Sequence, residues 1–134
     1  MQTRAELLHF PIVTDSCGSL IYAETGAQLP FTAVRFFVIA GVPTEAVRGR
    51  HAHRACQQLA VAVHGSCRMR LTDGLGSDEV TLDSPTIGLY IPPLVWVEQS
   101  DFEPETVVLV LASMMYDPAD YIRSFPEFLD IVAA

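Results

Sequence analysis

The hydrophobic positions of this chain fall in short runs, and glycines, prolines and clusters of aspartate and serine separate one run from the next. Several runs alternate apolar and polar residues, which is the pattern of a strand with one buried face. Many short strands at regular spacing predict an all-β sandwich or barrel. The expected strands are Leu7–Val13, Ser19–Glu24, Val34–Ile39, Gln57–His64, Cys67–Leu71, Glu79–Leu82, Gly88–Ile91, Trp96–Ser100 and Thr106–Ala112.

In three of these segments the pattern also predicts which faces of the strand are buried. Leu59, Val61 and Val63 share one face of the segment 57–64, so that face is expected to be buried and the other is not. The segment 67–71 alternates in the same way and turns two arginines to solvent. Val107–Leu111 is apolar on both faces, which predicts a central strand.

The last eighteen residues change to a helical period. Asp117 followed by Pro118 suits a helix N-cap and its first helical position. Apolar residues then recur at helical spacing, but Pro126 interrupts them, so we expect two short helical turns packed on the barrel. The apolar positions are Tyr121, Ile122, Phe125, Phe128, Leu129 and Val132.

Length and charge limit the function classes. The 134 residues fit one domain, taken as 1–134. All eight basic residues are arginine, which excludes lysine Schiff-base chemistry, and the net charge of -8 argues against nucleic-acid binding. No apolar run is long enough to span a membrane and no leader is visible, so a cytoplasmic protein is expected. The three cysteines lack C-x-x-C spacing and are expected to be free thiols.

The segment Arg48–Arg54 holds the strongest chemical signal, a pair of histidines separated by one residue. On a strand, His51 and His53 point the same way and could act as a base and its helper or chelate a metal. The spacing resembles the first cupin motif, with Gln58 in the place of the usual glutamate. The segment Pro92–Val97 resembles the second cupin motif, but Val97 stands where the fourth metal ligand usually lies. A cupin jelly-roll barrel without a metal site is therefore expected, because two imidazoles fall short of an ordinary site.

An ordered set of motifs over nearly the whole chain resembles the dTDP-4-keto-6-deoxyglucose 3,4-ketoisomerase family, small cupins of deoxysugar biosynthesis. The set comprises Asp15–Leu20, Leu29–Phe31, Arg35, Arg48–Arg54, His64–Cys67, Leu82–Pro85, Gly88–Pro93, Val95–Trp96, Leu111–Ser113 and Tyr116–Arg123. The resemblance implies that a dTDP-linked ketosugar is isomerised from C4 to C3 through an enediol, with no cofactor. It implies that His51 is the base and that His53 orients it or moves a proton between the sugar oxygens.

The resemblance also implies which residues bind the substrate. Arg35, Arg48 and Arg54 adjoin the family motifs and are the candidates for the diphosphate, since guanidinium groups bind phosphate bidentately. Gln58 is a further candidate. Tyr90 and Trp96 fit substrate stacking and core packing equally well. A homodimer that exchanges the N-terminal strands, up to Glu24, is expected.

The sequence departs from the family at several positions. Family members carry two tyrosines where this chain has Phe37 and Val38, and Cys17 and Val97 stand where arginine and histidine are common. Phe37 cannot move a proton, so a catalytically silent nucleotide-sugar-binding cupin is one alternative. A metal-dependent cupin oxygenase and a 3,5-epimerase are the others. The intact histidine pair favours the isomerase.

Overall fold

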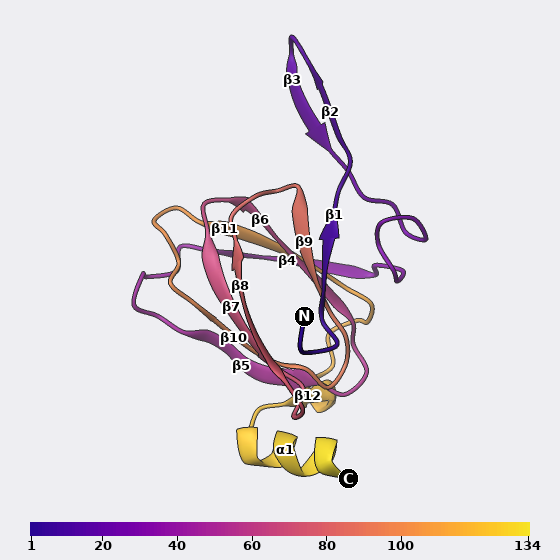
Figure 1. Ribbon diagram of the computed structural model, residues 1–134, viewed down its shortest axis with the longest axis vertical. Coiled ribbons are helices and arrows are strands. Elements are labelled where there is room, and N and C mark those ends of the chain that lie inside the picture. Colours follow the sequence, from indigo (N-terminus) through magenta and orange to yellow (C-terminus); the bar gives the residue numbers. More distant parts are fainter.

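The computed structural model describes residues 1–134 and is built mainly from antiparallel strands (Figure 1). Two five-stranded sheets and a separate hairpin account for all twelve strands. In spatial order the first sheet contains β1 (Glu6–His9), β9 (Ile87–Ile91), β6 (Gln58–His64), β11 (Val107–Ala112) and β4 (Arg35–Ala40). The second contains β12 (Tyr121–Ile122), β5 (Arg48–His53), β10 (Trp96–Ser100), β7 (Cys67–Thr72) and β8 (Ser77–Leu82).

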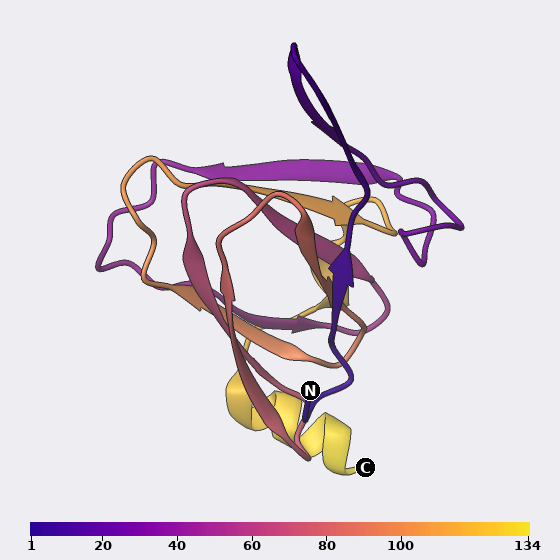
Figure 2. The ribbon, with the colours of Figure 1, turned by 45° about the horizontal axis from the view of Figure 1, so that its top comes forward.

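The two sheets face one another and enclose the main hydrophobic core (Figures 1 and 2). Sixteen buried residues form this core, among them Ala60, Met69, Leu89 and Val108 from both sheets. The predicted all-β cupin architecture is confirmed, but the two sheets do not join into a closed barrel. The space between them stays accessible from one end, where the histidine strand lies.

Strand β6 is buried on both faces as far as Ala62, so the prediction of one buried face is wrong. Ala60 and Ala62 face the main core, while Leu59 and Val61 pack in a second cluster with Phe10, Leu29 and Phe31. The physical reason is that the segment between β1 and β4 crosses the outer face of the sheet and covers it. Strand β11 lies between β6 and β4, as its two apolar faces predicted.

The expected strand Leu7–Val13 is divided at Phe10 and Pro11. Residues before the break form β1, and residues after it form β2 (Ile12–Asp15), which pairs only with β3 (Gly18–Ile21). This hairpin projects from the body of the molecule (Figures 1 and 2). Proline has no N–H to donate to a neighbouring strand, which is why the pairing with the main sheet stops there.

The C-terminal segment differs most from the expectation. Asp117 caps the short 3-10 turn η1 (Pro118–Asp120) as predicted, with its side chain accepting a hydrogen bond from Ala119 N. Tyr121 and Ile122 are not helical; they form β12, which pairs with β5. Pro126 does not interrupt a helix but stands in the first turn of α1 (Phe125–Ala133), because Ser124 is the N-cap.

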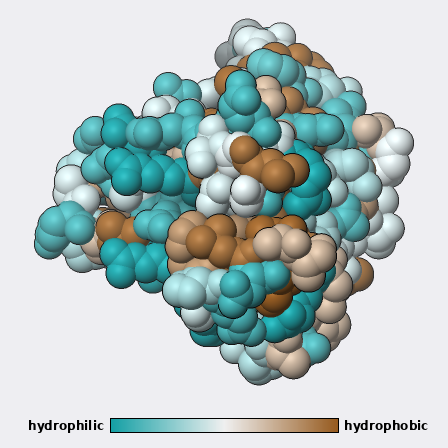
Figure 3. All heavy atoms as spheres, turned by 60° about the horizontal axis from the view of Figure 1, so that its bottom comes forward, coloured by the Kyte–Doolittle hydropathy of each residue, from teal (hydrophilic) through white to brown (hydrophobic).

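Helix α1 covers part of the outer face of the second sheet, next to β12 (Figure 1). Phe128 is fully buried and packs with Ala52, Trp96 and Ile122 in a third hydrophobic cluster. The surface of the molecule on this side mixes hydrophilic and apolar side chains (Figure 3). No helix in the structure has the length and apolarity needed to span a membrane.

Candidate active site

Both histidines lie on β5, and an irregularity in that strand shapes the site around them. The register between β5 and β10 shifts next to Val97, where Gly49 and Arg50 both have positive φ, 81° and 57°. A Cβ on Gly49 would lie 2.9 Å from the Val97 carbonyl oxygen, so only glycine fits this bulge. In a regular strand, Arg48 and His51 would point to opposite faces, and the bulge turns both toward one cavity.

A cavity of about 200 Å³ lies between the two sheets at this end. Half of its lining is apolar and half is polar, as expected of a site that positions a polar ligand. It is lined by Phe37, Ile39, Arg48, Gly49, His51, Gln58, Ala60, Ile91, Gln99, Val110, Tyr121 and Arg123.

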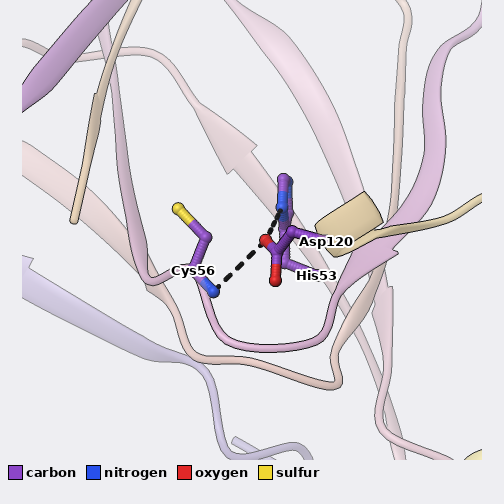
Figure 4. A group of neighbouring side chains, drawn as sticks. All are labelled: His53, Cys56 and Asp120. Carbon is purple, nitrogen blue, oxygen red and sulfur yellow. Dashed lines mark hydrogen bonds and ion pairs between the residues drawn. The ribbon is translucent and has the colours of Figure 1, made fainter. Parts of the chain in front are cut away.

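His53 is held by a buried carboxylate. Its Nδ1 lies 2.8 Å from Oδ2 of Asp120, and both side chains are about 95% buried (Figure 4). Asp120 also accepts hydrogen bonds from the backbone N–H groups of Ala55, at 2.7 Å, and Cys56, at 3.3 Å. Burial alone would raise the pKa of Asp120, but these hydrogen bonds outweigh burial and lower it. The carboxylate is therefore ionised, and His53 Nδ1–H donates to it.

The other ring nitrogen of His53 is the free acceptor. Nε2 is buried and has no hydrogen-bond partner within the chain. Burial lowers the pKa of His53, although Asp120 opposes that effect. A neutral imidazole with Nδ1 protonated leaves a lone pair on Nε2, which can accept a hydrogen bond from a ligand hydroxyl.

His51 lies beside His53, with ring centroids 5.1 Å apart and the rings perpendicular. The pKa of His51 is lowered to about 4, mainly by burial; a hydrogen bond with the Gly49 backbone opposes this effect, and the charges of His53 and Arg123 add to it. An unperturbed histidine has a pKa of about 6.5. In this structure His51 is instead a neutral base throughout the physiological range.

Tyr121 and Arg123 belong to the site, although neither was predicted as a site residue from the sequence. Tyr121 pairs with His53 across β12 and β5, and directly paired residues project to the same side of a sheet. The Tyr121 ring lies 4.4 Å from that of His53 and 5.1 Å from that of His51, between centroids. The Arg123 guanidinium lies 4.3 Å from the centre of the Tyr121 ring. The only signal for these residues was their place in a family motif.

Three of the predicted substrate-binding residues lie at or beside the cavity. Arg48 and Gln58 line it. Arg35 lies at its margin: its guanidinium is 5.5 Å from the centre of the Phe37 ring, and its charge acts on the pKa of His53. Gln99 lines the cavity as well; it is 9% exposed, and its Oε1 has no partner within the chain.

The other three predicted substrate-binding residues, Arg54, Tyr90 and Trp96, lie away from the cavity. Arg54 is exposed and forms an ion pair with Glu127 of helix α1 at 3.2 Å. Trp96 is buried on the outer side of its sheet against Phe128. Tyr90 lies on the outer face of the first sheet. Alternation along a strand explains Arg54 and Trp96, which project to the side opposite their neighbours His53 and Val97.

The residues at the four cupin ligand positions do not fit a metal ion. Val97 is buried and apolar, and Gln58 is a neutral amide, so His51 and His53 are the only strong donors. A second group, His53, Cys56 and Asp120, offers donor atoms within 4.8 Å of one another. However, the Asp120 oxygens already accept three hydrogen bonds, and the Cys56 sulfur is turned away from them (Figure 4). Neither group of residues therefore provides an ordinary metal site.

Two facing antiparallel sheets with a paired-histidine cavity between them define a protein of the cupin fold. Over residues 3–133 the chain matches the family described as FdtA: WxcM-like, C-terminal, and it belongs to that family. It is 42% identical, over 96% of its length and 92% of the relative's, to TDP-4-oxo-6-deoxy-alpha-D-glucose-3,4-oxoisomerase of Aneurinibacillus thermoaerophilus.

Solved structures agree with this assignment. A 3,4-ketoisomerase from Helicobacter canadensis superposes with a TM-score of 0.95 at 35% identity, covering 98% of this chain and 99% of that one. QdtA, a sugar 3,4-ketoisomerase from Thermoanaerobacterium thermosaccharolyticum solved in complex with TDP, also gives 0.95 at 35% identity, with coverages of 99% and 97%.

Proposed function

We propose that this chain is a sugar-nucleotide 3,4-ketoisomerase that converts a TDP-linked 4-keto-6-deoxyhexose into its 3-keto isomer. The observation that carries the proposal is the cavity in which His51 and Tyr121, whose rings both pack on His53, meet two arginines and two buried amides. The relatives named above support the reaction class and the TDP-linked substrate. A mutant of QdtA was solved in complex with TDP-4-keto-6-deoxyglucose, which supports the same sugar.

The chemistry requires only proton transfers. His51 removes the proton from C3, the electron pair forms the C3–C4 double bond, and the C4 carbonyl oxygen takes up a proton, which gives an enediol. O3 then loses its proton, the C3 carbonyl forms, and the protonated His51 returns a proton to C4. The neutral His51 of this site is ready to start this sequence, and the buried position strengthens its polar interactions with the sugar.

The charged residues at the mouth of the cavity support a diphosphate there. Arg48 and Arg123 line the cavity and are exposed, and Arg35 stands beside them. Guanidinium groups pair bidentately with phosphate oxygens, and three of them would offset the net negative charge of the chain locally. The sugar would then lie deeper, between His51 and the amides of Gln58 and Gln99.

A silent nucleotide-sugar-binding protein is the second candidate, because Phe37 stands in the cavity without a proton to exchange. Incubation with TDP-4-keto-6-deoxyglucose, followed by proton NMR, separates the two candidates. We expect signals of the 3-keto product with the wild type, and a loss of about 10²-fold or more with His51→Asn while TDP still binds. Binding without any product in the wild type would favour the silent protein.

The same assay tests independence from metal ions. We expect turnover to be unchanged after exhaustive chelation, because only two residues at the cupin ligand positions are strong donors. Loss of turnover that one added divalent ion restores would contradict this. A cytoplasmic location stays a prediction.

We also propose that the chain acts as a homodimer in which the hairpin β2–β3 packs on a second copy. Val13 and Leu20 of this hairpin are more than half exposed although both are apolar. Phe36 and Val38 of the edge strand β4 are exposed to a similar degree. Exposed apolar patches of this kind on a small chain favour association.

A further inference from the structure

Two buried side-chain atoms have no hydrogen-bond partner within the chain: His53 Nε2 and Gln99 Oε1. A buried polar atom without a partner is costly, so each of these atoms is expected to bind a group of the ligand. His53 Nε2 can exchange a proton and therefore suits the oxygens that react. An amide oxygen only accepts hydrogen bonds, so Gln99 suits a hydroxyl that keeps its proton throughout the reaction.

Gln99 faces the cavity from β10, and its neighbours offer no donor to its Oε1. Alternation along β10 turns Trp96 and Glu98 outward, where the Trp96 indole N–H donates to Glu98 Oε2 at 3.1 Å, and turns Gln99 inward. In the adjoining strands Gln99 is paired with Met69 of β7 and Arg48 of β5. The Met69 side chain has no N–H or O–H group, and Arg48 is exposed. The donor for Oε1 therefore has to come from what occupies the cavity.

The order of residues along β5 and β10 matches the order of groups along a nucleotide sugar. Arg48, proposed above for the diphosphate, is paired with Gln99. The base His51 is paired with Val97, about 7 Å further along β10. In the sugar, C2 lies between C1, which carries the diphosphate, and C3, which loses its proton to the base. Gln99 therefore lies on the diphosphate side of the base, as the 2-hydroxyl does.

We propose that Gln99 Oε1 accepts a hydrogen bond from the 2-hydroxyl of the sugar and thereby selects substrates that carry this hydroxyl. The inference rests on the ketoisomerase function proposed above and adds a specificity-determining residue to it. A 4-keto-6-deoxyhexose linked through O1 has hydroxyls only at C2 and C3, and the C3 hydroxyl loses its proton in the reaction. The 2-hydroxyl is thus the donor that lasts from substrate to product. A 2-deoxy sugar would leave the buried Oε1 unpaired, which is how a site rejects an analogue that lacks a hydroxyl.

The experiment compares TDP-4-keto-6-deoxyglucose with its 2-deoxy analogue, TDP-4-keto-2,6-dideoxyglucose, by proton NMR. We expect the wild type to convert the analogue with a kcat/KM lower by about 10- to 100-fold. Most of the loss should lie in KM, because a hydrogen bond to an unreacting hydroxyl is the same before and during the reaction. In Gln99→Met, which removes the amide but keeps an unbranched side chain, the two sugars should differ by less than about threefold. Gln99→Leu should behave likewise.

Gln57→Met is the matched control. It removes an amide outside the cavity lining, whose Oε1 already accepts a hydrogen bond from the Tyr90 hydroxyl at 2.7 Å. The control should keep the wild-type preference. Because the preference is a ratio of two substrates on one protein, a loss of stability alone does not change it, and a difference in intrinsic reactivity between the sugars would persist in every variant.

Three outcomes would contradict the inference. A wild type that converts both sugars equally well would overturn the role of Gln99 and leave the proposed function intact. A preference that persists in Gln99→Met, or that disappears instead in Gln58→Met on the opposite wall, would assign the 2-hydroxyl to another group. Turnover of neither sugar, with normal TDP binding, would overturn the proposed function and the inference with it.

Discussion

Asp120 holds the His53 ring in position. We therefore expect that removing the charge of Asp120 impairs both turnover and stability. Asp120→Asn keeps the shape but offers an N–H₂ group where His53 Nδ1–H now donates to a carboxylate. The imidazole must then present its other tautomer, and Nε2 loses its free lone pair. We expect turnover to fall by about 10²-fold and the free energy of unfolding to fall by about 1–3 kcal/mol. Steady-state kinetics and urea unfolding measure both.

The matched control for Asp120→Asn is Asp117→Asn, which lies three residues earlier and caps the exposed turn η1. Asparagine caps a helix about as well as aspartate does. The control should keep wild-type turnover and stability. Equal behaviour of the two variants would show that the buried carboxylate does not hold His53 in its active tautomer.

The buried position of His51 predicts an unusual pH profile. Because burial lowers the pKa of His51 to about 4, the base stays deprotonated when the pH falls through 6.5. The acid limb of kcat/KM, which reports the free enzyme, should therefore lie below pH 5. Stability has the opposite tendency in this window: the unfolded chain binds the proton first, so the fold loses stability as the pH falls from about 6.5 toward 4. An acid limb near pH 6.5 would show that His51 is solvated or is not the base.

At the scale of single residues, the sequence predicted His51 and His53 as site residues. It did not predict Asp120, Tyr121 and Arg123, which lie around them. A pair spaced by one residue on a strand is visible in any sequence, because alternation is local. Asp120 stands 67 positions from His53, and its contact depends on how two distant segments meet. Arg54 and Trp96 show the converse limit of the sequence, since they adjoin the motifs but project to the outer side of the sheet.

Helix α1 holds the shortest strand of the site in place, and this predicts the effect of a core substitution outside the cavity. Phe128 is fully buried against Ala52 and Ile122, the residues that alternate with the site residues of β5 and β12. Phe128→Ala should lower the free energy of unfolding by about 3–5 kcal/mol. It should also lower turnover, because β12 then loses its support behind Tyr121. Phe125→Ala is the control, since Phe125 is 40% exposed and should cost much less.

Denaturant unfolding and steady-state kinetics of Phe128→Ala and Phe125→Ala test whether the buried phenylalanine supports both the fold and the site. Equal losses of stability would contradict the burial difference, and full activity of a destabilised Phe128→Ala would show that β12 does not need the helix.

Of the strands with five or more residues, all but β5 were among the segments expected from the sequence pattern, whereas the two-residue β12 was not. Two residues are too few to show a period of two, and Tyr121 and Ile122 also fit the helical spacing of the residues that follow. What makes them a strand is the pairing with β5, a contact that local propensity does not contain. The same limit explains β6, whose second buried face depends on the distant Phe10, Leu29 and Phe31.

At the scale of the whole molecule, the projecting hairpin predicts the oligomeric state. Val13 and Leu20 are paired across β2 and β3, so they lie on one face, and charge on both should oppose any contact that covers them. We expect the wild type to sediment as a dimer and Val13→Asp/Leu20→Asp as a monomer in analytical ultracentrifugation. Thr14→Asp/Ser19→Asp alters the next cross-strand pair, whose side chains face the opposite side, and should remain dimeric. A monomeric wild type would contradict the proposed dimer.

His53 is translated 67 positions before Asp120, the carboxylate that holds its ring. The site therefore cannot assemble until the later residues have left the ribosome and β12 has paired with β5. Until then, the growing chain carries both imidazoles with no carboxylate to fix either of them.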